Sequence, residues 1–530
     1  MRDKVLNLIG VGLIAVCFVL SLGRILMAKK QTENEKVIRI AHIQLEGGVR
    51  SALDKIAGEY MRLHPGVKVM QIPIPQSIFT NWLITQLVGG TAPDIIETST
   101  GQTEDRMVRF FYPLTDLMNA PNPYNAGTGL EGVPLRSTMF DGGASCYSSQ
   151  LLEYFGVSIS GLTTRAYYNR DLLRKVTGSD AIPKTYEEFL SVCKKTAEYS
   201  KRTGKTLIPV AGSKYNGPMI MGQLFNSQTQ KLMDTLLPPA YATPNGTRIA
   251  DAYLRGKWSL QSPAIVSGLD LMREVAEQMQ PGFMQVQRDD AMFYFVQGRA
   301  LCYVSGSWDA TSLRDQVSFP LGIGTIPIPS TDNPQYGSNV IGKFSEAGTN
   351  AGIEFSLTRN SANPEIARDF LLFMMSKSMQ ELWTRESGWI PAVVDVQPGE
   401  DAMPFMPGED GYLAGFSLTN IGGADLARIF DNNFDVLISP FGGTQAFLKA
   451  IGPAFNKAVI SDLHRSYQTQ LSSNRRMDGI LCGLAWKAEG NPGDAAAAHK
   501  YDLLIQGGSA RDRAFYLTRL MLLRAGEPAE

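Results

Sequence analysis

Residues 154–195 constrain the fold of this chain more than any other stretch, because they place an extended segment before two helices. Residues 157–168 alternate small, polar and apolar side chains, which predicts an extended segment, and a short basic helix is expected at 169–176. Thr185 suits the N-cap of the next helix, and Glu188 stands where a capping box has its carboxylate. The block predicts an α/β crossover and contains no recognisable nucleophile.

The N-terminal part of the chain repeats the same alternation of strand and helix. Strands are expected at residues 37–43, 67–72 and 92–97, and helices at 51–64 and 79–87. Strands that alternate with helices favour a parallel sheet. At 530 residues, with 44% hydrophobic and 19% charged residues, the chain is long enough for two or three compact α/β units.

Small and polar residues follow the first and third of these strands. Gln44 and Glu46 come after the first, and Thr98 and Ser99 after the third. In open parallel sheets, ligands bind at the carboxyl ends of the strands. These four side chains are therefore candidate ligand-binding groups.

Several blocks occur in the order found in the maltose-binding-like receptors of ABC importers, the extracellular solute-binding protein family 1. They are Tyr-Tyr-Asn-Arg-Asp-Leu at 167–172, Pro-Lys-Thr-Tyr-Glu-Glu-Phe at 183–189, His-Pro-Gly-Val-Lys-Val at 64–69, Gly-Gly-Thr-Ala-Pro-Asp-Ile-Ile at 89–96 and Gly-Ser-Trp at 306–308. The chain resembles this family over about residues 37–395. It departs from the family pattern at Arg170, where Lys is usual, and at the additional Lys184.

The resemblance implies a two-lobed periplasmic-binding-protein-like fold of type II, with mixed sheets flanked by helices and extended hinge crossings. The second crossing is expected at 319–329, where prolines favour extended backbone. The expected boundaries are 37–153 with 325–395 for lobe 1, 154–324 with 396–490 for lobe 2, and 491–530 for a C-terminal helical extension. Helices are expected at 446–471, 476–487, 495–505 and 510–524.

The resemblance also implies the function: binding of a sugar or oligosaccharide and its delivery to ABC permease subunits by hinge closure. The protein is then a monomer with no enzymatic activity and no cofactor. Two alternatives stay open. One is a membrane-tethered sensor that presents its ligand to a receptor or kinase, and the other is an exported enzyme acting on polysaccharide.

A sugar presents hydroxyl edges, which match carboxylate and amide groups, and apolar ring faces, which match aromatic side chains. Glu346 and Asn350 are further candidates for the edges. The candidate aromatic platforms are Tyr168, Tyr215, Trp308 and Trp389. Tyr168 and Trp389 could equally be core aromatics, whereas Trp308 stands in a Gly-Ser loop with little core to join.

The N-terminus carries an apolar run at residues 5–23 with Arg2 and Lys4 before it. This length suits a membrane span or a signal peptide within residues 1–30. An uncleaved anchor at residues 5–28 is favoured over a cleaved signal and over a buried helix. Either way the body is expected at the periplasmic or extracellular face.

Other functional classes find little support in the composition. A net charge of −1 argues against a nucleic-acid partner. The four histidines are scattered, so no metal site is expected. Cys193 and Cys302 have core-like neighbours and are expected as buried thiols, whereas a disulfide at Cys146 stays open. Residues 337–343 fit the start of a phosphate-binding loop, but Phe344 replaces its Ser or Thr.

Overall fold

The computed structural model describes residues 36–527, except 100–101, 237–245, 348–350 and 492. The chain forms two compact units. Unit 1 comprises Met1–Ser148, Glu153–Gly161 and Ala351–Pro398, and unit 2 comprises Ser149–Leu152, Leu162–Asn350 and Gly399–Glu530. The expected anchor at residues 5–28 lies outside the described residues. Within the described part, no helix is both long and apolar enough to cross a membrane.

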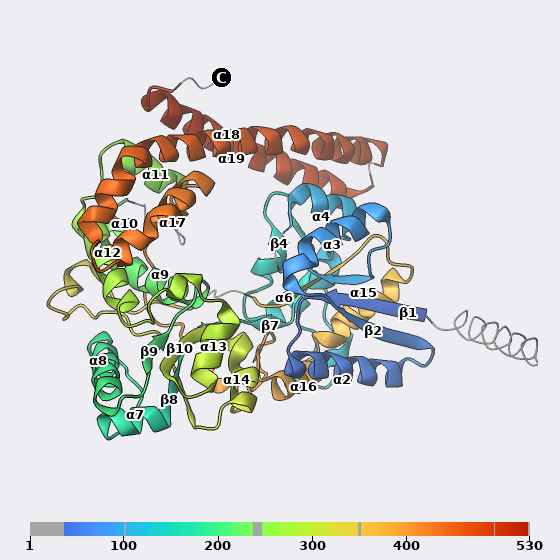
Figure 1. The fold of residues 1–530 in the computed structure, drawn as a ribbon. Coiled ribbons are helices and arrows are strands. Elements are labelled where there is room, and N and C mark those ends of the chain that lie inside the picture. Colours follow the sequence, from blue (N-terminus) through green and yellow to red (C-terminus); the bar gives the residue numbers. More distant parts are fainter. Residues whose placement is uncertain (1–35, 100–101, 237–245, 348–350, 492, 528–530) are drawn as a thin grey trace, which may run out of the picture. The chain divides into compact units, whose positions relative to one another are not determined.

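Unit 1 is an α/β unit (Figure 1). Its strands are β1 (Lys36–His42), β2 (Val67–Pro73), β3 (Ile95–Glu97), β4 (Tyr147–Ser148), β5 (Glu153–Tyr154), β6 (Val157–Ser158), β7 (Ser160–Gly161), β12 (Glu354–Leu357) and β13 (Ile390–Pro391). Its helices are α2 (Gly47–Leu63), α3 (Gln76–Gly89), α4 (Glu104–Phe110), α5 (Thr115–Asn119), α6 (Leu135–Thr138), α15 (Pro364–Met374) and α16 (Lys377–Ser387). The main sheet has the order β2-β1-β3-β12-β6.

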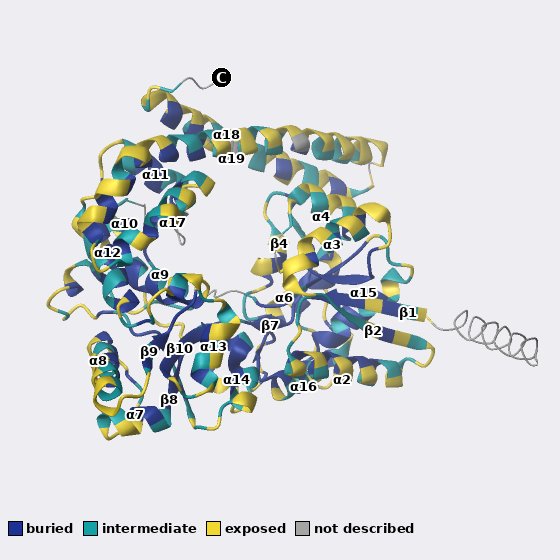
Figure 2. Ribbon diagram, in the orientation of Figure 1, coloured by how far each residue is buried: buried dark blue, intermediate teal, exposed yellow. Residues whose placement is uncertain are grey.

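The first strands of this sheet pair as the sequence predicts. β1 is parallel to β2, with Lys36 opposite Val67, and parallel to β3, with Ile40 opposite Ile95. β12 comes from a later segment and pairs antiparallel with both β3 and β6, so the sheet is mixed. β3, β6 and β12 are largely buried, whereas the edge strand β2 has a single buried residue (Figure 2). The predicted βαβ start and the mixed α/β class are confirmed.

Unit 2 is also α/β. Its strands are β8 (Thr164–Asn169), β9 (Ile208–Ala211), β10 (Ala300–Gly306) and β11 (Leu321–Gly324), in the sheet order β11-β8-β10-β9. Its helices are α7 (Arg170–Thr177), α8 (Tyr186–Thr203), α9 (Asn216–Gln228), α10 (Gln230–Leu236), α11 (Gly246–Leu254), α12 (Pro263–Ala276), α13 (Arg288–Val296), α14 (Ala310–Gln316), α17 (Ala424–Ile438), α18 (Thr444–Gly490) and α19 (Ala495–Arg524). β10 is parallel to β9 and antiparallel to β8.

The predicted capping box begins α8. The Thr185 hydroxyl accepts a hydrogen bond from the Glu188 N–H (3.2 Å), and the Glu188 carboxylate accepts one from the Thr185 N–H (3.3 Å). Both partners lie within one turn, which is why the sequence alone locates this helix start.

The extended segment at 157–168 is divided in the structure into β6, β7 and β8. β6 and β7 belong to unit 1, and the chain passes into unit 2 between Gly161 and Leu162. The segment 319–329 was expected to return the chain to lobe 1. Instead, β11 pairs with β8, and Ile326 is buried in the core of unit 2. Residues 325–350, which the sequence pattern placed in lobe 1, group with unit 2.

The C-terminal part differs from the expected four helices. α18 is one helix of 47 residues and α19 one helix of 30, so the expected breaks near 472 and 506 are absent. Ring stacking of Tyr467 on Phe515, with centroids 4.7 Å apart, joins the two helices. Packing between them outweighs the weak helix propensity of their Gly, Ser and Asn residues.

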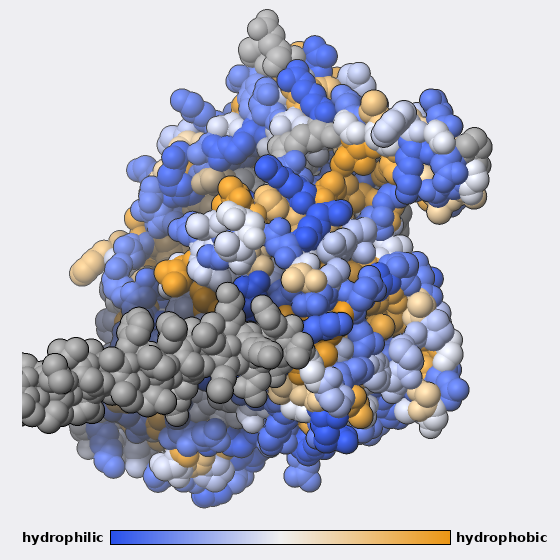
Figure 3. All heavy atoms as spheres, turned by 90° about the vertical axis from the view of Figure 1, so that its right-hand side faces the viewer, coloured by the Kyte–Doolittle hydropathy of each residue, from blue (hydrophilic) through white to orange (hydrophobic). Residues whose placement is uncertain are grey.

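The described surface is mixed, and hydrophilic side chains prevail over much of the face shown in Figure 3. The cysteines at 146, 193 and 302 are buried free thiols. The expected buried thiols are therefore confirmed for Cys193 and Cys302.

Arg165, at the start of β8, is a buried centre of hydrogen bonds in unit 2. Its side chain is 2% exposed and forms a two-pronged ion pair with Glu346, with N–O distances of 2.6 and 3.0 Å. The same guanidinium donates to the backbone carbonyls of Pro404, Phe405 and Met406 at 2.9, 3.2 and 2.9 Å. Three segments that are distant in sequence are therefore held by one side chain.

Replacing Arg165 with Met should lower the free energy of unfolding by about 3 kcal/mol or more. The substitution removes the ion-pair partner of the Glu346 carboxylate and one donor from each of the three carbonyls. Arg174→Met is the matched control, because Arg174 is 56% exposed and its ion pairs with Asp171 and Asp180 lie at the surface. The control should cost less than about 1 kcal/mol. Urea unfolding measures both, and equal losses would contradict the role given to Arg165.

Candidate functional site

Polar groups meet at the carboxyl edge of the unit 1 sheet around Glu97, the last residue of β3. Its carboxylate is buried and accepts three hydrogen bonds. The Ile43 N–H donates at 2.9 Å, the Gln44 amide at 2.8 Å and the Ser99 hydroxyl at 3.1 Å. The Glu354 N–H in turn donates to the Ser99 Oγ at 3.0 Å. We call Gln44, Glu97, Ser99 and Glu354 the unit 1 cluster.

The two carboxyl groups of the unit 1 cluster are both harder to ionise than ordinary glutamates. Burial raises the pKa of Glu97, while the hydrogen bonds from Ile43, Gln44 and Ser99 oppose the shift. Burial also raises the pKa of Glu354 to about 7, and the negative charges of Asp141 and Glu97 add to the shift. The cluster therefore offers hydrogen-bond acceptors at a partly desolvated surface.

The other unit 1 candidates lie next to this cluster. Glu46 occupies the N-cap of α2, directly after the loop that carries Gln44. Thr98 follows Glu97, is buried, and shares a hydrogen bond of 2.8 Å with the Ser356 hydroxyl. The structure thus brings Gln44, Thr98 and Ser99 together, as expected from strands whose carboxyl ends share one edge.

A second polar group lies at the carboxyl ends of β9 and β10 in unit 2. The Arg288 guanidinium forms an ion pair with Asp309 and stands over the Tyr215 ring, 5.3 Å from its centroid. The Ser305 hydroxyl donates to the second Asp309 oxygen at 2.5 Å. Burial raises the pKa of Asp309, and the Arg288 charge opposes this shift. We call Tyr215, Arg288, Trp308 and Asp309 the unit 2 cluster.

Trp308 is half-buried and is positioned by the glycine two residues before it. A Cβ atom at Gly306 would lie only 2.1 Å from the Trp308 ring, so the ring rests directly on the glycine backbone. The indole is thus fixed beside Asp309 before any ligand arrives. A fixed aromatic ring next to charged hydrogen-bonding groups is suited to the face and edge of a sugar ring.

Several sequence candidates lie elsewhere. Tyr168 is 0% exposed in the core of unit 2, and Trp389 is 2% exposed in unit 1, where it packs against Trp383. Neither ring has an open face, so both are core aromatics, which corrects their assignment as platforms. The Glu346 carboxylate is bound by Arg165 and accepts from the Gly408 N–H, so it has a structural role. Asn350 lies outside the described residues.

Sequence reasoning missed four members of the two clusters: Glu97, Arg288, Asp309 and Glu354. A local signal existed for two of them. Glu97 is the single charged residue at the end of an apolar strand, and Asp309 directly follows Trp308. Arg288 and Glu354 had no such signal, because their neighbours in space are distant in sequence.

The two clusters consist of carboxylate, amide, hydroxyl, guanidinium and aromatic groups. Neither holds a serine or cysteine beside a histidine base. Among the described residues, no group of three or more His, Cys, Asp or Glu side chains could hold a metal ion.

Glu354 should make stability depend on pH. Its pKa is about 7 in the folded protein against an ordinary 4.5, so the folded state holds the proton more tightly. The resulting stabilisation is complete below pH 4.5 and is lost as the pH rises through 7. Wild-type protein should therefore lose up to about 3 kcal/mol more than Glu354→Gln between pH 5 and pH 8. Urea unfolding at both pH values tests this, and identical pH dependence would contradict it.

The sequence of this chain is similar to those of bacterial solute-binding proteins. The sequence model of the bacterial extracellular solute-binding proteins matches residues 55–404. The chain is 20% identical over 254 residues to YcjN of Escherichia coli (strain K12), by name a periplasmic-binding protein of an ABC transporter. That match spans 48% of this chain and about half of YcjN, 52%.

Solved structures share the fold. The "Chitin oligosaccharide binding protein" matches with a TM-score of 0.54 and 15% identity, over 80% of this chain and 99% of that one. The GacH receptor of Streptomyces glaucescens GLA.O, solved unliganded and in complex with acarbose, matches with a TM-score of 0.55 and 15% identity, over 80% and 98%. The resemblance seen in the sequence is therefore confirmed, and the chain belongs to the bacterial extracellular solute-binding proteins.

Proposed function

We propose that this solute-binding protein takes up a sugar or oligosaccharide outside the cytoplasm and delivers it to the permease of an ABC importer. The observation that carries the proposal is the unit 2 cluster. It combines a preformed aromatic surface, Trp308, with the ion pair between buried Asp309 and partly exposed Arg288. A sugar needs this combination, because its ring faces are apolar and its edges carry hydroxyl groups.

The unit 1 cluster supports the same ligand class. Its acceptors on Glu97 and Glu354 match the hydroxyl donors of a sugar, and Gln44 and Ser99 add groups that both donate and accept. In this proposal Glu46 and Thr98 flank the bound sugar, and Tyr215 adds a second ring at the unit 2 cluster.

The names of similar proteins point in the same direction. Chitin oligosaccharide and acarbose are the compounds named for two structural neighbours, and an ABC transporter is named for the E. coli relative. These proteins are 15–20% identical to this chain, so the individual sugar must be identified by a binding screen.

The mechanism we propose is ligand-driven closure. A ligand that has a higher affinity for a closed conformation than for an open one shifts the population towards the closed conformation. The permease subunits then recognise the closed form. The protein acts as a monomer, without a cofactor or a covalent step, and residues 5–28 tether it to the cytoplasmic membrane.

Trp308→Ala should lower the affinity for the bound sugar about five- to thirty-fold, because stacking on one aromatic ring contributes on the order of 1–2 kcal/mol. The soluble body, residues 35–530, is screened against mono- and oligosaccharides by thermal shift, and each hit is measured by calorimetry. A ligand that binds only the folded state raises the melting temperature. Trp486→Ala is the matched control, since Trp486 is 79% exposed on α18.

The control variant should bind like wild type. Equal affinity of wild type and Trp308→Ala for a sugar would remove Trp308 from the site. The absence of a shift with any sugar would contradict the carbohydrate proposal and redirect the search to other small solutes.

A further inference from the structure

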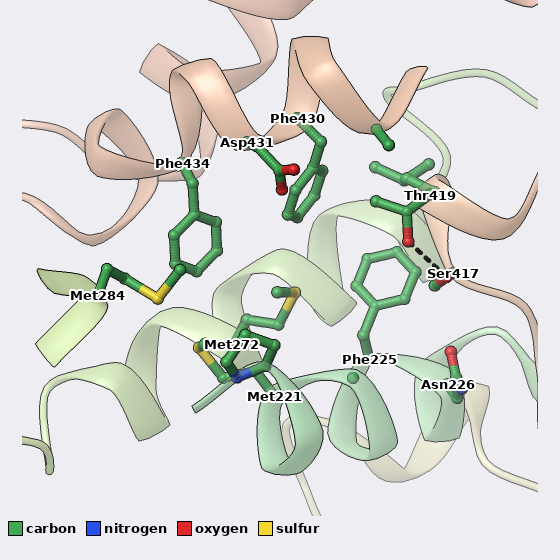
Figure 4. Close-up of a pocket in the computed structure, with 14 residues that line it drawn as sticks. Met221, Phe225, Asn226, Met272, Met284, Ser417, Thr419, Phe430, Asp431 and Phe434 are labelled. Carbon is green, nitrogen blue, oxygen red and sulfur yellow. Dashed lines mark hydrogen bonds between the residues drawn. The ribbon is translucent and has the colours of Figure 1, made fainter. Parts of the chain in front are cut away.

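Unit 2 contains a pocket of 420 Å³ (Figure 4). None of the residues that line it belongs to either cluster. It is formed by α9, α12 and α17 together with Met284 and the segment 417–419. All of these elements belong to unit 2, so the pocket does not depend on the other unit. Its volume lies in the range of small-molecule sites, roughly 300–1,000 Å³.

Sulfur and aromatic side chains dominate the lining. They are Met221, Met272, Met284, Phe225, Phe430 and Phe434. Methionine side chains adapt to irregular apolar groups, and the phenylalanine rings present π faces. Such a lining favours an apolar body in the ligand.

An unsubstituted sugar matches this lining poorly. Of the polar lining groups, the Ser417 and Thr419 hydroxyls are hydrogen-bonded to each other at 3.0 Å. A sugar enclosed here would leave most of its hydroxyl groups without partners, and each costs free energy when it is removed from water.

The remaining polar side chains are Asp431, an acceptor, and Asn226, whose amide group both accepts and donates. Figure 4 shows the Asp431 carboxylate directed between the rings of Phe430 and Phe434. Asp431 is exposed, and no described residue forms an ion pair with it. The buried Asn226 Oδ1 likewise accepts no hydrogen bond within the described part of the chain. A carboxylate beside aromatic faces attracts an organic cation, through charge and through the ring quadrupoles.

We propose that this pocket binds an organic ammonium ion with an apolar body, whose charged nitrogen pairs with Asp431 while the body lies among the methionine and phenylalanine side chains. The proposal does not rest on sugar binding by the two clusters, and its test leaves Trp308 untouched.

The test uses two probes of nearly equal size, phenethylammonium and the neutral 2-phenylethanol, in calorimetric titrations at pH 7. Phenethylammonium should bind wild type at least ten-fold more tightly than 2-phenylethanol. Asp431→Asn should abolish this preference, because it weakens the binding of phenethylammonium and leaves the binding of 2-phenylethanol unchanged. Asp431→Glu should restore much of the preference. A cation–carboxylate contact should also weaken as salt is raised.

A filling variant tests the location. Gly222 lines the pocket in the middle of α9, and a Cβ atom there meets nothing within 4 Å, so Gly222→Leu can place its side chain in the empty space. It should fold and lose phenethylammonium binding. Gly58→Leu, on the exposed side of α2 where a Cβ atom also meets nothing within 4 Å, is the matched control and should bind like wild type.

Three results would overturn the proposal: no binding of phenethylammonium to wild type, equal affinity for the two probes, or unchanged binding in a folded Gly222→Leu variant. If phenethylammonium does not bind but a sugar does, this proposal is wrong and the proposed function is unaffected. If no sugar binds but phenethylammonium does, the proposed function is wrong and this proposal is unaffected.

Discussion

The buried ion pair between Arg165 and Glu346 is the interaction on which the rest of unit 2 depends. Arg165 lies four residues after the chain enters this unit, and Glu346 lies shortly before the chain leaves it. The carbonyls of Pro404 to Met406, which the same guanidinium binds, follow soon after the chain returns. A planar group with five donors can hold all three segments at once, which a lysine could not. The two ends of the main unit 2 segment and the start of its C-terminal part are thereby fixed together.

This constraint also positions the candidate site. β8, which begins at Thr164, pairs with β10, and β10 leads directly into Trp308 and Asp309. The two clusters share one structural feature. A carboxylate at the end of a strand, Glu97 in unit 1 and Asp309 in unit 2, is buried and held by neighbouring donors. Its orientation is set before the ligand binds, which reduces the entropy that binding must overcome.

Local chemistry made much of the fold predictable from the sequence. The capping box of Thr185 and Glu188 and the parallel pairing of β1 with β2 depend on neighbours or on short periodic patterns. The site was harder to predict, because Glu354 and its partner Ser99 are 255 residues apart. The structural pair Arg165 and Glu346, 181 residues apart, likewise has no local signal. For the same reason Glu346 was taken for a ligand group. Periodicity also cannot separate a core aromatic from an exposed one, which is why Tyr168 stayed among the candidate platforms until its burial was known. In α18 and α19, packing between helices overrode the weak propensities that predicted breaks.

The central proposal is that a sugar binds at the polar clusters. Hydrogen–deuterium exchange with and without a saturating sugar tests it most directly, because a bound ligand slows amide exchange where it contacts or orders the backbone. The account predicts slower exchange at 43–48 and 97–99 in unit 1 and at 212–216 and 305–310 in unit 2. Unchanged exchange at 305–310, or slower exchange found only outside these segments, would contradict the proposal.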